Sequence, residues 1–62
     1  MNEKLLTEAE VAEWLGYSPR TVQGWRLRGE GPAHVVVAGK TIRYRANDVK
    51  DWLDRQTAKE KA

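Results

Sequence analysis

The sequence has no cysteine and a single histidine, His34. It therefore cannot form a disulfide, a thiolate nucleophile or a zinc site of the Cys/His type. It also lacks the run of about 18 apolar residues that spans a bilayer and the basic-then-apolar start of a signal peptide. We expect a cytoplasmic protein with no metal ion, no cofactor and no contact with a membrane.

Sixty-two residues are enough for one domain, and a domain of that size buries only about 60% of its unfolded surface. Three tryptophans, Trp14, Trp25 and Trp52, can each bury a large area, so we interpret them first as structural. We place the domain at residues 1–56. The polar residues 57–62 are predicted to form a tail that frays.

The formal net charge of +2 is unevenly distributed. Residues 1–15 carry one lysine and four glutamates, a net charge of −3, and residues 46–62 carry four charges of each sign. Residues 16–45 carry six basic residues against Glu30 alone, a net charge of +5. Positive charge confined to the middle of the chain can form one face for a polyanion.

A first helix is indicated by Thr7 and Glu10, which have the spacing of a capping box. Leu6 before the cap and Val11 in the helix would form a hydrophobic staple. Gly16 is placed to end the helix after about two turns.

A second helix follows almost at once. Ser18 is a natural N-cap, and Pro19 suits the first helical position because its missing N–H costs nothing there. The helix should run to about Arg28, with Gly29 as its stop. Helical periodicity places Val22, Trp25 and the stem of Arg26 inward, and Arg20, Gln23, Gly24 and Leu27 outward.

Two β-prone runs, 35–37 and 41–45, flank a Gly-X turn. With Gly39-Lys40 as a two-residue turn, Val37 faces Ile42 and the two strands alternate consistently. The predicted apolar face carries Val35, Val37, Ile42 and Tyr44, and the predicted basic face carries Val36, Thr41, Arg43 and Arg45.

A third helix should begin at Asn47 as its N-cap, with Asp48 favourably placed in the first turn. The elements together predict a mainly α-helical fold with a small β-hairpin, a winged helix-turn-helix of three helices and a two-stranded wing. The predicted core contains Val11, Ala12, Leu15, Val22, Val35, Ile42, Tyr44, Val49, Trp52 and Leu53.

This combination predicts a protein that binds double-stranded DNA, because the second helix fits the major groove and its outward side chains meet base edges. Arg20 can donate two hydrogen bonds to guanine, Gln23 can pair with adenine, and Gly24 would let the helix lie close to the groove floor. The predicted helix contacts are Ser18, Arg20, Thr21, Gln23, Gly24, Arg26 and Arg28. The predicted wing contacts are Lys40, Thr41, Arg43 and Arg45.

Each of these residues also has an interpretation without DNA. Arg20 and Gln23 can be solvated surface residues, and Arg28 can serve the negative end of its helix. The cations of the wing can protect an exposed strand from edge pairing. The acidic residues are explained by capping and by helix surfaces, and no carboxylate pair or nucleophile with a base emerges. We therefore expect no enzymatic activity.

From Leu5 to Leu53 the chain resembles the excisionase and AlpA-type branch of the MerR-like winged-helix proteins. The resemblance rests on the order and spacing of many residues rather than on one short motif. These are Leu5-Leu6-Thr7, Glu10, Ala12, Leu15-Gly16, Ser18, Arg20-Thr21-Val22, Trp25-Arg26, Arg28-Gly29-Glu30, Pro32, Gly39-Lys40, Ile42-Arg43-Tyr44, Val49 and Trp52-Leu53. Members often have an aromatic and then a basic residue where this chain has Gln23-Gly24, so phosphate contact at these two positions is not carried over.

The resemblance implies a small phage or mobile-element protein that acts at the nucleoid and binds DNA as adjacent copies. The chain ends shortly after the third helix, without the dimerisation helix and effector domain of full MerR regulators, so we expect no small-molecule ligand. We expect an excisionase, a recombination directionality factor that bends DNA for a site-specific integrase. The alternatives are a small AlpA-type transcriptional regulator with the same surface and a protein-interaction adaptor that does not bind DNA.

Overall fold

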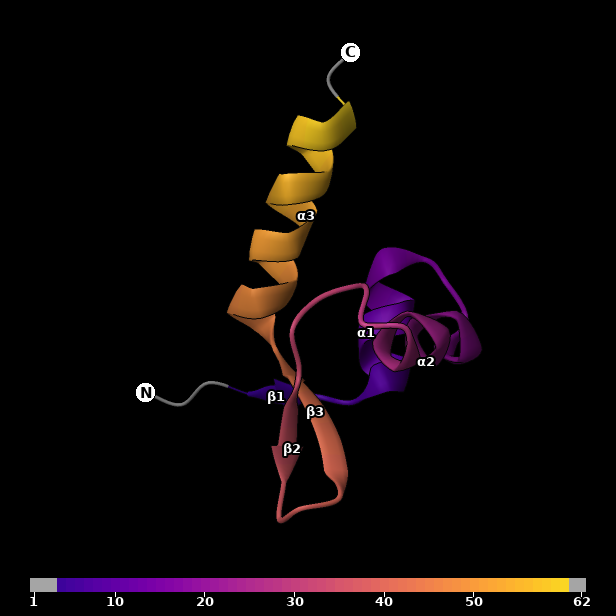
Figure 1. Ribbon diagram of the computed structural model, residues 1–62, viewed down its shortest axis with the longest axis vertical. Helices are drawn as coiled ribbons and strands as arrows, with labels where there is room; N and C mark the ends of the chain where they lie inside the picture. The colour runs from indigo at the N-terminus through magenta and orange to yellow at the C-terminus, as the bar shows by residue number, and fades with distance from the viewer. Residues whose placement is uncertain (1–3, 61–62) are drawn as a thin grey trace.

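The structure, a computed structural model, describes the backbone of residues 4–60 and the side chains of residues 4–56. The elements follow in the order β1 (Leu5–Leu6), α1 (Glu8–Leu15), α2 (Pro19–Leu27), β2 (Val35–Val37), β3 (Thr41–Arg45) and α3 (Ala46–Glu60). In Figure 1, α1 and α2 form a lobe at one side, the β2–β3 hairpin extends downward and α3 projects upward. The predicted winged helix-turn-helix is confirmed.

The predicted limits of α1 are confirmed. The hydroxyl of Thr7 accepts a hydrogen bond from the Glu10 amide at 3.0 Å, and the Glu10 carboxylate accepts one from the Thr7 amide at 2.9 Å. The helix ends where Gly16 adopts the left-handed conformation (φ 82°). The amide of Tyr17 then donates a hydrogen bond to the carbonyl of Ala12 at 2.9 Å. These contacts satisfy backbone groups that a helix end otherwise leaves unpaired.

Helix α2 begins and ends by the same physics. Its N-cap Ser18 accepts a first-turn amide hydrogen bond, and Pro19 occupies the first helical position. At the other end Gly29 has φ 75°, and the Glu30 amide donates to the Trp25 carbonyl at 2.7 Å. Three residues, 16–18, separate the two helices, which gives the helix-turn-helix its tight connection.

The sheet has three antiparallel strands in the order β1-β3-β2. The third strand, β1, was not predicted. It pairs Leu5 with Arg45 and Leu6 with Tyr44, so the start of the chain is attached to the base of the hairpin. Two residues are too few to show the alternation by which a strand is recognised in sequence.

The hairpin pairs one residue away from the predicted register. Its turn is centred on Ala38 and Gly39, with φ of 56° and 77°, instead of on Gly39 and Lys40. Two consecutive residues with positive φ match the twist of a hairpin, but alanine rarely adopts that conformation, so the sequence did not suggest it. The observed pairs are Val35 with Arg43, Val36 with Ile42 and Val37 with Thr41. The predicted assignment of the β2 side chains to the apolar and basic faces of the hairpin is therefore wrong.

The core joins both helices of the lobe to β3 and to the first half of α3. Its fully buried side chains are Val11, Ala12, Val22, Tyr44 and Val49, and the half-buried side chains packed against them are Leu6, Leu15, Trp25, Ile42 and Leu53. The prediction was wrong for Val35 and Trp52, which are half-buried and lie outside this cluster. The Trp52 ring instead contacts the Trp25 ring, with centroids 5.2 Å apart.

Helix α3 starts at Ala46, directly after the last residue of β3. Asn47 therefore lies inside the first turn, and its predicted role as N-cap is wrong because no loop separates the strand from the helix. Asp48 is in the first turn, as predicted. The helix continues to Glu60, past the expected domain end at residue 56, and the fraying of 57–62 stays a prediction, with 61–62 outside the described residues. No helix within residues 4–60 is long and apolar enough to cross a membrane.

Candidate nucleic-acid interface

The outer face of α2 presents polar side chains that the protein itself does not use. Arg20 and Gln23 are exposed, and neither forms a hydrogen bond or ion pair with another residue whose side chain is described. Gly24 lies beside them, where an added Cβ would come within 3.3 Å of the Arg28 guanidinium. A long cation and a long amide thus share one accessible face with Gly24, which is half-buried beneath the Arg28 guanidinium.

Ser18 and Thr21 are occupied at the start of the same helix. The Ser18 hydroxyl accepts from the Thr21 amide at 3.3 Å, and the two hydroxyls are 3.1 Å apart. Their first task is to satisfy the N-terminal turn. Both hydroxyls nevertheless lie at the positive end of the helix, where an anion is favoured.

Arg26 points inward, into a network that joins three elements. Its Nε donates a hydrogen bond to Oε2 of Glu8 in α1, and the Tyr44 hydroxyl of β3 donates to the same oxygen at 3.3 Å. Only 19% of the Arg26 side chain and 21% of the Glu8 side chain remain exposed. The predicted DNA contact by Arg26 is untested, but its guanidinium already has a partner within the fold.

Two members of the network, Arg26 and Tyr44, have raised pKa values. The hydrogen bond to Glu8 raises the pKa of Arg26. Burial first, and then the charge of Glu8, raise the pKa of the Tyr44 phenol to about 12. The sequence offered no signal for this arrangement, because Glu8 lies 18 positions from Arg26 and 36 from Tyr44.

Arg28, in contrast, is held loosely. Its guanidinium forms an ion pair with Glu30 at 3.2 Å, and the two side chains are 59% and 60% exposed. An exposed pair of this kind contributes little to stability, so a phosphate can replace the carboxylate at small cost.

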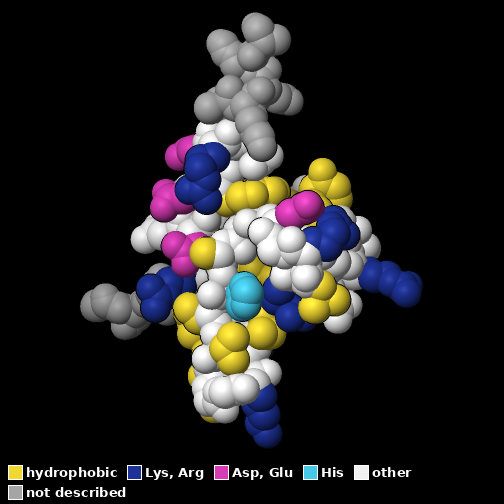
Figure 2. All heavy atoms as spheres, in the orientation of Figure 1, with side chains coloured by type: hydrophobic (Ala, Val, Ile, Leu, Met, Phe, Trp, Pro, Cys, Tyr) yellow, Lys and Arg dark blue, Asp and Glu magenta, His cyan; other side chains and the backbone are white. Residues whose placement is uncertain are grey.

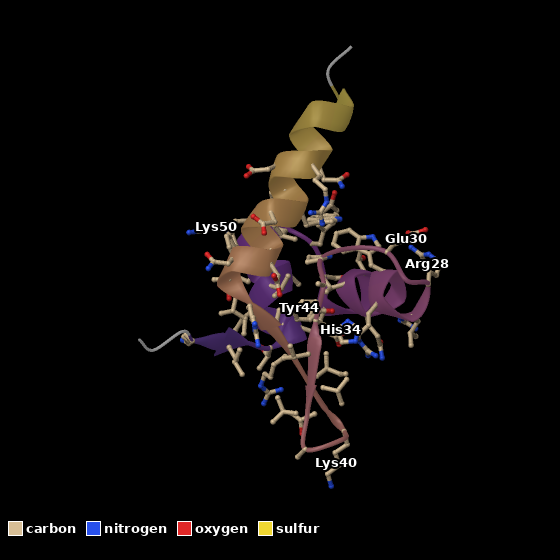
Figure 3. The ribbon with its side chains drawn as sticks, turned by 60° about the vertical axis from the view of Figure 1, so that its left-hand side comes forward. Arg28, Glu30, His34, Lys40, Tyr44 and Lys50 are labelled. Carbon is tan, nitrogen blue, oxygen red and sulfur yellow. The ribbon has the colours of Figure 1, made fainter. Side chains whose placement is uncertain are left out.

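The wing carries cations of two kinds. Lys40 projects at its tip (Figure 3) and Arg45 is exposed at its base, and neither has a charged or hydrogen-bonded partner among the described side chains. Arg43 is half-buried and donates from Nη1 to the carbonyl of Ile42 at 2.8 Å. Thr41 is half-buried beside the turn.

Charged side chains are unevenly distributed over the surface. Figure 2 shows dark blue side chains at the outer edge of the α1–α2 lobe and at the tip of the wing, whereas along α3 magenta carboxylates lie beside dark blue side chains. The carboxylate of Glu10 in α1 has a lowered pKa, mainly because it accepts the backbone hydrogen bond of Thr7, with smaller contributions from Lys4 and Arg43. The excess of positive charge lies on α2 and the wing, as the segment charges indicated, and α3 carries both signs.

His34 lies at the start of the wing, with its ring centroid 6.0 Å from that of Tyr44 (Figure 3). Among the described residues no group of three histidines, cysteines or carboxylates could hold a metal ion.

These features have a counterpart among known proteins. A family model described as a helix-turn-helix domain matches residues 5–57. The chain belongs to this helix-turn-helix family. No curated protein and no solved structure matches it.

A helix-turn-helix domain binds DNA, so DNA is the partner of this chain. In such a domain the second helix enters the major groove and the first crosses the backbone. Here that second helix is α2, whose outer face is the one left without internal partners. Helix-turn-helix families are DNA-binding families and are typically non-enzymatic.

Proposed function

We propose that this helix-turn-helix protein is of the excisionase type: it recognises specific duplex sites, binds neighbouring sites cooperatively and bends the DNA for a site-specific integrase. The observation that carries the DNA-reading part is the contrast within α2. Arg26 on the inner face is held by Glu8, whereas Arg20 and Gln23 on the outer face have no partner among the described side chains. Side chains in that state can form base contacts without breaking internal bonds.

The dimensions of α2 suit the major groove. An α-helix with its side chains is about 10–12 Å across, which fits a groove about 12 Å wide, and the nine residues of α2 supply about 13.5 Å of helix to lie in it. In the proposed complex Arg20 and Gln23 read base edges, with Gly24 allowing close approach. Ser18 and Thr21 lie near a phosphate at the helix start, and Arg28, Lys40, Thr41, Arg43 and Arg45 contact the backbone on either side.

The test of reading against anchoring uses Arg20→Ala and Gln23→Ala beside Arg43→Ala. The first two should relax the preference at particular base pairs by about 1–3 kcal/mol, because a lost base contact affects only the base it read. Arg43→Ala should weaken binding to all sequences alike. With about four phosphate contacts, the plot of log affinity against log salt should have a slope near −3.6. If Gln23→Ala lowered the affinity for all sequences alike, the proposed orientation of α2 in the groove would be wrong.

Cooperative binding follows from how little one short helix can read. A few base pairs cannot compete with about 10⁶ or more nonspecific sites, whereas weak contacts between adjacent copies become effective once DNA brings the copies together. Gel-shift titration on one-site and two-site duplexes, with sedimentation of the free protein, tests this. We expect the free protein to be a monomer. Binding per site should be tighter on the duplex that carries two sites about one helical turn apart. Equal affinity per site would remove the cooperative part of the proposal.

Excision and transcriptional control use the same DNA-binding surface and must be separated by assay. An excisionase should stimulate integrase-mediated excision in vitro and increase DNA bending in a circular-permutation gel. A promoter that responds to the protein without integrase would support the AlpA-type alternative. Failure to bind any duplex at low salt would leave only an adaptor role.

A further inference from the structure

The most exposed large apolar side chain among the described residues is on α2. Leu27 is 70% exposed, more than Tyr17 at 53% and Val36 at 52%. Neither of those residues lies on α2. Leu27 follows Arg20 by seven positions and Gln23 by four, which places all three side chains along one stripe of the helix surface. An apolar side chain thus stands within the face that is otherwise polar and unpaired.

The major groove offers one apolar group among the base-edge groups that distinguish the four base pairs, the 5-methyl of thymine. The other groups are hydrogen-bond donors and acceptors, which a leucine cannot satisfy and would desolvate at a cost. Gly24 lies one turn before Leu27 and adds no side chain of its own between the helix and the bases, although the flexible Arg28 side chain reaches over this position.

From this placement we infer that Leu27 determines specificity by packing against a thymine methyl group. The inference rests on the proposed DNA binding through α2 and adds a base that neither arginine nor glutamine reads. At 1.5 Å per residue, Leu27 lies about 6 Å along the axis from Gln23 and about 10 Å from Arg20. With base pairs about 3.4 Å apart along the DNA axis, and with α2 inclined to that axis in the groove, the thymine should fall within about two base pairs of the one read by Gln23 and within about three of the one read by Arg20.

Deoxyuridine provides a probe that removes only the methyl group. The full chain is used to select duplexes from two random libraries, one made with thymidine and one with deoxyuridine in its place. In the first selection we expect one position of the bound site to prefer thymine. In the second selection this position should lose its preference, while the positions assigned to Arg20 and Gln23 keep theirs. On the selected site, replacing that thymine by uracil should weaken binding about fourfold, the factor expected for burying one methyl group.

The variant Leu27→Ala should bind the thymine and uracil duplexes equally, and Leu27→Gln, which keeps the length of the side chain, should do the same. Val36→Ala removes an exposed apolar side chain from the wing and is the matched control, so it should keep the fourfold ratio. Equal binding of both duplexes by the native chain, with sequence preference otherwise intact, would overturn the inference and leave the proposed function standing. A fourfold ratio retained by Leu27→Ala would overturn it as well. Absence of any duplex binding would instead refute the proposed function itself.

Discussion

The lobe of α1 and α2 and the outer wing, residues 35–41, are stabilised by different means. In the lobe, Val11, Ala12 and Val22 are fully buried, and Arg26 is joined to Glu8 and Tyr44. In the outer wing no residue is fully buried, and its order comes from backbone pairing between β2 and β3 and from the turn. Stability therefore resides in the lobe with the Tyr44 end of β3, and the outer wing can change its surface without endangering the fold.

The largest expected effect is at the point where the core and the network meet. Tyr44→Ala should lower the free energy of unfolding by about 3–5 kcal/mol, because it removes a fully buried ring and a hydrogen bond to Glu8. Val36→Ala, in the outer wing, should change it by no more than about 0.5 kcal/mol. Urea unfolding followed by tryptophan fluorescence measures both.

If Tyr44→Ala prevents folding altogether, Tyr44→Phe keeps the ring and tests the hydroxyl alone. Similar values for Tyr44→Ala and Val36→Ala would abolish the distinction between the two regions.

Effects of intermediate size on stability are expected at two glutamate–arginine pairs. Glu8→Ala should cost about 1–2 kcal/mol, because it leaves the mostly buried guanidinium of Arg26 without its acceptor. Glu30→Ala should cost about 0.5 kcal/mol or less, because its pair with Arg28 is exposed to water. Parallel thermal melts compare them, and equal shifts in Tm would show that burial of the first pair has no energetic consequence.

The last expected effect is a loss of stability that appears only at high pH. The pKa of Tyr44 is raised from 10.0 in the unfolded chain to about 12 in the folded protein. Between these values the unfolded chain binds fewer protons than the native one, so the stability supplied by the neutral phenol is present below pH 10 and falls as the pH rises toward 12. Melts between pH 9 and 12 should show a fall that is shallower in Tyr44→Phe. An identical slope in both proteins would contradict the buried position of this hydroxyl.

Features that depend on neighbours in sequence could be predicted. Examples are the capping box of Thr7 and Glu10 and the helix ends at Gly16 and Gly29. Each depends only on residues within about one helical turn, so the local sequence is enough to predict it. The outward position of Arg20 follows from helical periodicity in the same way.

Features that depend on distant partners could not be predicted. The side-chain type of Arg26 is that of a phosphate contact, and only the fold brings Glu8 against it. The register of the hairpin depended on Ala38 adopting a positive φ, which its residue type disfavours. Trp52 was assigned to the core from its spacing, but its ring packs half-buried against the ring of Trp25, a residue 27 positions away.

The junction between Arg45 and Ala46, where β3 passes into α3 with no loop, makes the wing and the third helix one mechanical piece. A joint without a hinge transmits rotation instead of absorbing it. If the tip of the wing contacts a DNA backbone, as proposed, a tilt of the hairpin would be passed on to the axis of α3. Fifteen residues at 1.5 Å per residue make a lever about 22 Å long, so a tilt of a few degrees at the hairpin becomes a displacement of an ångström or more at the far end of the helix.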